Sequence, residues 1–160
     1  MCFTNKKPWY TKLLGIKPIP KIALTDLYVI KVLENHNGQL MSPFQEFSYS
    51  INTLYSQKII VEDSKHSLEN FFDIEYGLHS CTVNGLHYMQ LVKFRNTELY
   101  LAKIPRGSLY YKNSSEVVSN NLIILNKIDL NTQMIPILHT NTSIKKGLSK
   151  IFNINKYKFL

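Results

Sequence analysis

The chain contains few cysteines and no long apolar run, and these absences exclude several classes of protein. Its two cysteines, Cys2 and Cys81, cannot form the disulfide framework of a small secreted domain. The longest apolar runs, such as Leu122–Leu125, are far shorter than the roughly 20 residues that span a bilayer. The apolar residues near the N-terminus are too few for a secretory signal. We therefore expect no membrane span, and a location in the cytoplasm or inside a larger particle.

Arginine is scarce, since only Arg95 and Arg106 occur among the 19 basic residues. Proteins that read nucleic-acid sequence use arginine heavily, because its planar fork binds bases and phosphates with two hydrogen bonds. The chain also lacks zinc-finger spacing, an aromatic ribonucleoprotein box and a helix-turn-helix pattern. Any contact with nucleic acid is therefore expected to be non-specific and to run through phosphates.

Positive charge is concentrated at the two ends of the chain. The net charge is +8, yet residues 1–21 and 141–160 each contain five lysines and no acid. Residues 22–140 contain nine basic residues and all eleven acids, a net charge of −2. Basic ends on a nearly neutral body favour an acidic partner, whereas the alternative is a lysine-rich composition inherited from an AT-rich genome. The residues expected to bind a partner are Lys6, Lys7, Lys12, Lys145, Lys146 and Lys150.

Length and composition predict one folded domain between two extensions. Of the 160 residues, 44% are apolar and 12% aromatic, which is enough to bury a core. Residues 1–24 are expected to form a basic arm, 25–140 a globular β-rich domain, and 141–160 a basic helix or tail. We predict an α+β fold with a small, twisted, mainly antiparallel sheet of about five to seven short strands and one or two short helices.

Apolar and β-branched runs locate the strands. Leu27–Leu33 is almost wholly apolar, which predicts a central strand covered on both faces. Leu99–Ile104 is a second strong strand, and Pro105-Arg106-Gly107 after it is a turn signal. Further strands are expected over residues 44–49, 59–62, 77–81, 109–111, 116–118 and 121–128.

The helical patterns are short. Pro8 suits the start of a helix over Trp9–Leu14 within the N-terminal arm. Thr82 is a capping residue for a helix over Val83–Lys93, which carries apolar residues on one face. Residues 144–152 place apolar side chains at helical spacing among lysines. We expect this basic amphipathic helix to pack on the body, and the alternative is that it binds a surface.

Five short blocks carry a resemblance when they are taken in order. They are Tyr28–Leu33, Ser42-Pro43-Phe44, Gly77-Leu78-His79-Ser80, Ile104-Pro105-Arg106-Gly107-Ser108 and Val117-Val118-Ser119-Asn120. Over about residues 27–128 the chain resembles small uncharacterised proteins encoded by gut bacteria and their phages, including crAss-like phages. The resemblance implies a phage or phage-associated context and carries over no activity.

The leading hypothesis is a non-catalytic phage or phage-associated protein that binds a macromolecular partner through its basic termini. The partner is expected to be a protein or a neighbour in a virion, with non-specific nucleic acid as a further possibility. The protein would then act in the host cytoplasm or within the virion, as a monomer or an oligomer. No cofactor is expected.

The alternative hypothesis is an enzyme. His79 at a strand start, followed later by Glu116, is similar in layout to ADP-ribosyltransferase-like folds. That similarity implies that His79 and Glu116 would orient the nicotinamide ribose of NAD, and Tyr110 or Tyr111 could stack on a ring. The competing interpretation is that His79 hydrogen-bonds inside the core or lies at an interface.

Three smaller possibilities complete the candidate sites. His79, Cys81 and His87 do not have the spacing of standard zinc ligands and lack a fourth ligand, so no metal site is expected. Cys2 would become an N-terminal nucleophile if Met1 were removed, although an unremarkable thiol is the simpler interpretation. Arg106 and Gly107 form a weak candidate for anion binding through backbone amides, and a plain turn explains them as well.

Overall fold

The computed structural model describes residues 3–43, 47–63, 70–82, 85, 97–128 and 160. These residues form thirteen strands and one helix, α1 (Trp9–Leu14), and all neighbouring strands pair in antiparallel fashion. The expected antiparallel sheet is confirmed, but the expected five to seven strands were too few. The helices expected over 83–93 and 141–160 lie outside the described residues, apart from Gly85 and Leu160. Within the described part, the α in the α+β assignment is supported by α1 alone.

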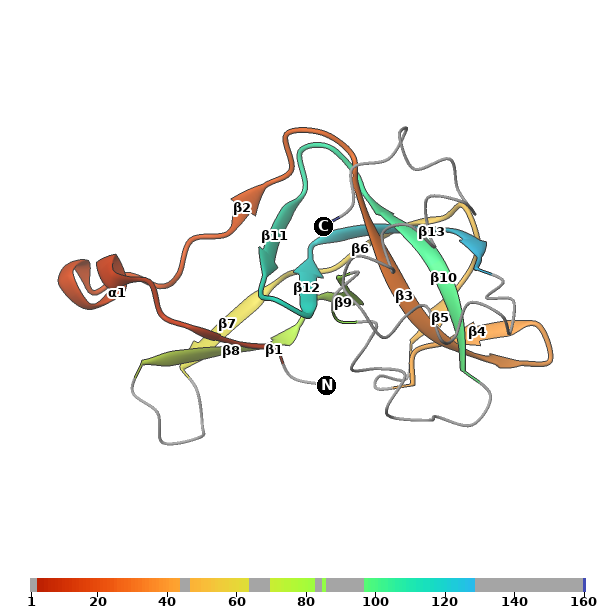
Figure 1. The fold of residues 1–160 in the computed structure, drawn as a ribbon, viewed down its shortest axis with the longest axis horizontal. Coiled ribbons are helices and arrows are strands. Elements are labelled where there is room, and N and C mark those ends of the chain that lie inside the picture. The colour runs from red at the N-terminus through yellow and green to blue at the C-terminus, as the bar shows by residue number, and fades with distance from the viewer. Residues whose placement is uncertain (1–2, 44–46, 64–69, 83–84, 86–96, 129–159) are drawn as a thin grey trace.

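The strands form two sheets (Figure 1). The smaller sheet has the order β1 (Phe3–Lys6), β8 (Phe71–Tyr76) and β7 (Ile60–Asp63). The larger sheet has the order β2 (Lys21–Ile22), β11 (Leu109–Lys112), β12 (Glu116–Ser119), β9 (Leu78–Cys81), β3 (Leu27–His36), β10 (Thr97–Ile104), β13 (Asn121–Lys127) and β6 (Leu54–Ser56). Beside this path, β4 (Gln39–Met41) pairs with β3 and with β5 (Ser48–Tyr49).

Strand β3 is the centre of the larger sheet, as its apolar sequence predicts. It pairs with β10 along eight consecutive residues and with β9 on its other side. Val29 and Ile30 point to opposite faces and are both fully buried, which shows that both faces are covered. Burying a side chain of this size contributes roughly 1.5–3 kcal/mol, so β3 is a principal source of stability.

Two apolar clusters fill the fold. The larger joins β3, β10 and β13, with Leu33, Ile104 and Leu122 among its fully buried members. The smaller lies between the two sheets, where Phe72 of β8 meets Tyr111 of β11 with ring centres 5.7 Å apart. The smaller sheet therefore packs against the larger one through aromatic side chains.

Gly77 lets one stretch of chain serve both sheets. It separates β8 from β9, so the strand leaves the smaller sheet and enters the larger one at this residue. Its φ is 135°, and a Cβ at this position would lie 2.4 Å from Cγ1 of Val118. Glycine is required here both for the backbone conformation and for the close approach of β12.

The structure corrects the expected N-terminal arm. Residues 3–6 form β1, which pairs with β8 about 70 residues away in sequence, and Phe3 is fully buried against Phe72. The first part of the arm thus belongs to the fold, because burial of Phe3 outweighs the freedom of a loose end. The helix expected over Trp9–Leu14 is confirmed; it begins after Pro8 and ends at Gly15, whose φ is 63°.

In the part of the chain that the structure describes, no helix is long and apolar enough to cross a membrane.

Candidate functional site

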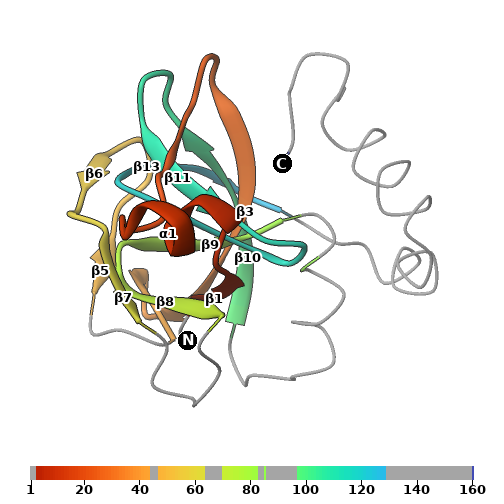
Figure 2. The same cartoon turned by 90° about the vertical axis from the view of Figure 1, so that its left-hand side faces the viewer.

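The segment that follows β1 exposes an unusual number of large apolar side chains. Each is between 42% (Ile16) and 80% (Leu24) exposed. We call the set the N-terminal surface: Trp9, Leu13, Leu14, Ile16, Ile19, Ile22 and Leu24. Single exposed apolar residues are normal on a monomer, but a set this dense along one segment makes that segment a candidate interaction site. Figure 1 shows α1 at the end of the molecule opposite β4, and Figure 2, viewed from that end, shows α1 in front of the strands.

Helix α1 is held by few contacts of its own. Only Thr11 is buried, and its hydroxyl donates a hydrogen bond of 2.7 Å to the carbonyl of Pro8. The hydroxyl of Tyr10 accepts a hydrogen bond of 3.0 Å from the amide of Ile19, which ties the helix to the following segment. Helices of six residues are marginal alone, and the apolar side chains of this one point into solvent. A partner that covers them would therefore stabilise the helix.

Two lysines beside the N-terminal surface have no counter-ion among the described residues. Lys12 and Lys21 form no ion pair in the described structure. Lys7 is different, because its ammonium group lies 2.7 Å from the carboxylate of Asp63. Of the residues expected to bind a partner, Lys12 thus remains available and Lys7 is already paired. Lys6 is exposed on β1, and Lys145, Lys146 and Lys150 lie outside the described residues.

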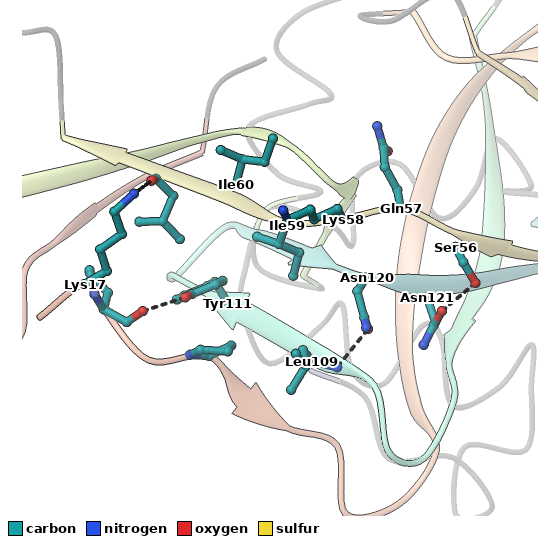
Figure 3. Close-up of a pocket in the computed structure, with 13 residues that line it drawn as sticks. Lys17, Ser56, Gln57, Lys58, Ile59, Ile60, Leu109, Tyr111, Asn120 and Asn121 are labelled. Atoms are coloured by element: carbon teal, nitrogen blue, oxygen red, sulfur yellow. Dashed lines mark hydrogen bonds between the residues drawn. The ribbon is translucent and has the colours of Figure 1, made fainter.

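A groove opens beside the N-terminal surface (Figure 3). It has a volume of about 800 Å³. One wall is the segment Lys17–Pro20, the other is the segment 56–61, and β11 forms the floor between them with Leu109 and Tyr111. Most of the lining is apolar, and Asn120 and Asn121 supply amide groups at one end.

Hydrogen bonds hold the groove in shape. The hydroxyl of Tyr111 donates a bond of 2.6 Å to the carbonyl of Pro18, which fixes the floor to one wall. The ammonium group of Lys17 donates a bond of 3.0 Å to the carbonyl of Val61, which joins the two walls. Asn120 accepts a bond of 2.8 Å from the amide of Leu109. A groove fixed in this way loses little freedom when it binds a ligand.

Sequence reasoning missed the groove, because its lining comes from three separate regions of the chain. The only signal available was the Pro18-Ile19-Pro20 stretch, which predicts an extended, exposed segment. Neither the 56–61 wall nor the β11 floor carries a motif that points to the other.

The structure brings His79 and Glu116 to the same face of neighbouring strands. Val118 lies opposite His79 and Glu116 opposite Cys81 in the β9–β12 pairing, so His79 and Glu116 are diagonal neighbours. Burial, and after it the charge of Lys31, lowers the pKa of His79 to about 4, whereas burial raises the pKa of Glu116. Neither residue lines the groove or the smaller pocket beside α1.

Lys31 is a buried charge that the sequence analysis overlooked. It is only 4% exposed, and its ammonium group donates a hydrogen bond of 2.5 Å to the carbonyl of His79. It has no carboxylate partner in the described structure. Burial lowers its pKa to about 8, against a smaller opposing effect of Cys81. The ammonium is enclosed by core residues, so it is a feature of the fold and offers no open binding site.

The turn at Arg106 and Gly107 uses its backbone amides internally. The amide of Arg106 donates a bond of 3.0 Å to the carboxylate of Asp26, and the amide of Gly107 donates one of 2.7 Å to the carbonyl of Ala23. Gly107 has a φ of 86°, as a turn glycine does. These two backbone amides are therefore already bonded within the protein, and the Asp26 carboxylate lies against the turn.

The described residues contain no group of three or more His, Cys, Asp or Glu side chains placed to hold a metal ion. His87 and Cys2 lie outside the described residues. Cys81 is buried, and burial raises the pKa of its thiol to about 12, so the described thiol is protonated at neutral pH.

No protein-family model, curated protein or solved structure matches this chain. The function is therefore argued from the geometry.

Proposed function

We propose that this chain is a non-catalytic binding protein that docks onto a protein partner through its N-terminal surface, in a phage or phage-associated setting. The observation that carries the proposal is the exposure of seven large apolar side chains on and after α1, beside Lys12 and Lys21, which have no counter-ion in the described structure. A stable fold gains nothing by leaving these side chains in water. A partner that covers these side chains removes their apolar surface from water, which favours binding.

The composition of the surface favours a protein over nucleic acid. Protein interfaces bury aromatic and aliphatic side chains in a central patch and place charges at the rim. Trp9, Leu13 and Leu14 on one short helix fit such a patch, and Lys12 and Lys21 fit a basic rim. Nucleic-acid surfaces are instead contacted mainly through phosphates, which requires arginines and lysines in place of leucines. The partner is therefore expected to present an apolar patch bordered by acidic residues.

The enzyme alternative gains no comparable support. His79 and Glu116 do lie on one face, but neither of them lines the groove or the smaller pocket beside α1. An NAD-using site would need both residues at the wall of a cleft that also holds an aromatic ring.

The proposal is tested by crosslinking followed by a binding assay. A photo-crosslinking side chain at position 13 of the full-length protein, expressed in the infected host, would capture the partner for identification by mass spectrometry. Binding of the purified partner is then measured for wild type, Leu14→Glu and Lys12→Glu. We expect both variants to weaken binding by about tenfold or more, equivalent to at least 1.4 kcal/mol.

Leu54→Glu is the matched control, because Leu54 is about as exposed as Leu14 but lies on β6. It should bind within about twofold of wild type. Equal losses for Leu14→Glu and Leu54→Glu would overturn the proposal. So would binding only to DNA, RNA or anionic phospholipid vesicles with no protein partner captured.

A further inference from the structure

The groove next to the N-terminal surface has the construction of a site for extended polypeptide. Its walls are two lengths of chain, Lys17–Pro20 and 56–61, that border a floor made by β11. Apolar side chains such as Pro18, Ile60 and Leu109 line it. This shape accepts a strand whose alternate side chains point down into the groove, since successive side chains of a strand point to opposite faces.

One wall offers unused backbone groups. Gln57 donates its amide to the carbonyl of Asn120 at 2.8 Å, and the next regular pairing is that of Ile60 with Tyr76 in β7. Between them, Lys58 and Ile59 form no backbone hydrogen bond in the described structure. An added strand requires main-chain amides and carbonyls that border the groove and have no partner.

The charged residues that line the groove in the described structure are all lysines. Lys17 and Lys58 line it, and no acidic residue is among the lining residues in the described structure. Lys58 is exposed and forms no ion pair there. Lys17 already donates to the carbonyl of Val61, and, after the hydrogen bond from Lys7, its charge lowers the pKa of the nearby Asp63. Lys58 is therefore the lysine that favours acidic side chains on the ligand and repels basic ones.

We propose that this groove binds an extended, acidic segment of a polypeptide, with apolar side chains in the groove and a carboxylate facing Lys58. The inference rests on the proposed function, because the segment would belong to the partner that covers the N-terminal surface. Its main-chain groups bond to Lys58 and Ile59, which supplies affinity with little dependence on sequence. The apolar lining and Lys58 supply the selectivity.

The test uses synthetic peptides of about six residues, the length of an ordinary strand. One set alternates Val, Ile, Leu or Phe with Asp or Glu, and a second set replaces the acids by lysine. Binding to the full-length protein is measured by fluorescence anisotropy for wild type, Lys58→Glu and Lys6→Glu. Lys6→Glu changes the net charge equally but lies on β1, outside the groove lining.

We expect the acidic set to bind wild type about tenfold or more tightly than the lysine set. Lys58→Glu should abolish this preference, and Lys6→Glu should keep it. The best acidic peptide at saturation should also slow hydrogen exchange at the amides of Lys58 and Ile59. Equal binding of the two sets, equal effects of the two variants, or unchanged exchange at these amides would each overturn the inference.

The outcome can be separated from that of the proposed function. If Leu14→Glu abolishes partner binding while the acidic peptides fail to bind, the N-terminal surface stands and the groove assignment is wrong. If the peptides bind but Leu14→Glu leaves the partner interaction intact, the groove stands and the N-terminal surface is not the docking site.

Discussion

The ammonium group of Lys31 lies 4.9 Å from the centre of the Tyr49 ring, inside the main core of the protein. The ring face stabilises the cation, and the carbonyl of His79 accepts one of its hydrogen bonds. These contacts replace only part of the hydration that the charge loses on burial. The lysine is therefore a cost to stability in a fold that is otherwise built around apolar strands.

Replacing Lys31 by methionine should stabilise the protein at pH 7. The native pKa of Lys31 is about 8 and its ordinary value is 10.5, so the unfolded chain binds this proton more tightly than the native protein does. The penalty is fully present below pH 8, shrinks as pH rises from 8 to 10.5, and vanishes above that. By linkage it amounts to about 3 kcal/mol at pH 7, and we expect Lys31→Met to recover roughly 1–3 kcal/mol of it.

Urea unfolding of wild type and Lys31→Met at several pH values measures this effect. The difference in free energy of unfolding should be largest at pH 7 and should decline between pH 8 and 10. Taking the difference matters, because burial also raises the pKa of Tyr49, which destabilises both proteins at high pH. A destabilised Lys31→Met at pH 7, or a difference independent of pH, would show that the buried amine is well compensated.

Gly77→Ala should strongly destabilise the fold. The new methyl group would lie 2.4 Å from Cγ1 of Val118, and the φ of 135° is unfavourable for alanine. Overpacking and strain together are expected to cost about 2–4 kcal/mol, measured by urea unfolding. Gly38→Ala is the control, because Gly38 also has a positive φ of 92° but meets nothing within 4 Å. It should cost about 1 kcal/mol, and equal losses at the two positions would mean that β12 yields to the methyl group.

Phe3→Ala tests whether the start of the chain belongs to the fold. Phe3 is fully buried between the two sheets, so its truncation is expected to cost about 3 kcal/mol. Leu24→Ala, at a residue 80% exposed, should change the free energy of unfolding by less than about 0.5 kcal/mol. A loss below about 1 kcal/mol for Phe3→Ala would restore the interpretation of residues 3–6 as a loose arm.

The difference between prediction and structure at the N-terminus has a physical origin. Strands β3 and β10 could be predicted because each carries its own run of apolar and β-branched residues. Strand β1 has only Phe3 as an apolar residue, and its pairing with β8 depends on contacts about 70 residues away, which no local pattern reports. The basic composition predicted an arm over residues 3–6, whereas the burial of Phe3 holds these residues in a strand.

Only part of the candidate site could be predicted from the sequence. Trp9–Leu14 could be recognised as a helix from Pro8 alone, but its exposed apolar face could not, since apolar residues on a short helix usually pack on a core. The groove could not be predicted, because it exists only when the segments 17–20 and 56–61 are brought together over β11. Lys31 is the one charged residue in the apolar run Leu27–Leu33, and the run predicts a covered strand without showing what the lysine itself contacts.

Tyr111→Phe connects the stability of the fold to the groove. The change removes the hydroxyl that donates to the carbonyl of Pro18 at 2.6 Å and leaves that carbonyl without its donor. We expect a loss of about 1–2 kcal/mol in the free energy of unfolding, because the phenol is buried enough to raise its pKa to about 12. We also expect faster hydrogen exchange at the amide of Ile19, since the Lys17–Pro20 wall is then less firmly held.

Tyr111→Phe should also weaken binding of the acidic peptides, because the looser Lys17–Pro20 wall must be ordered when the peptide enters. Tyr76→Phe serves as the comparison, since Tyr76 is 50% exposed on β8 and does not line the groove. It should leave stability, exchange at Ile19 and peptide affinity unchanged. If Tyr111→Phe destabilised the protein but left peptide affinity as it was, the wall formed by Lys17–Pro20 would take no part in binding, and the ligand would have to rest on the 56–61 side alone.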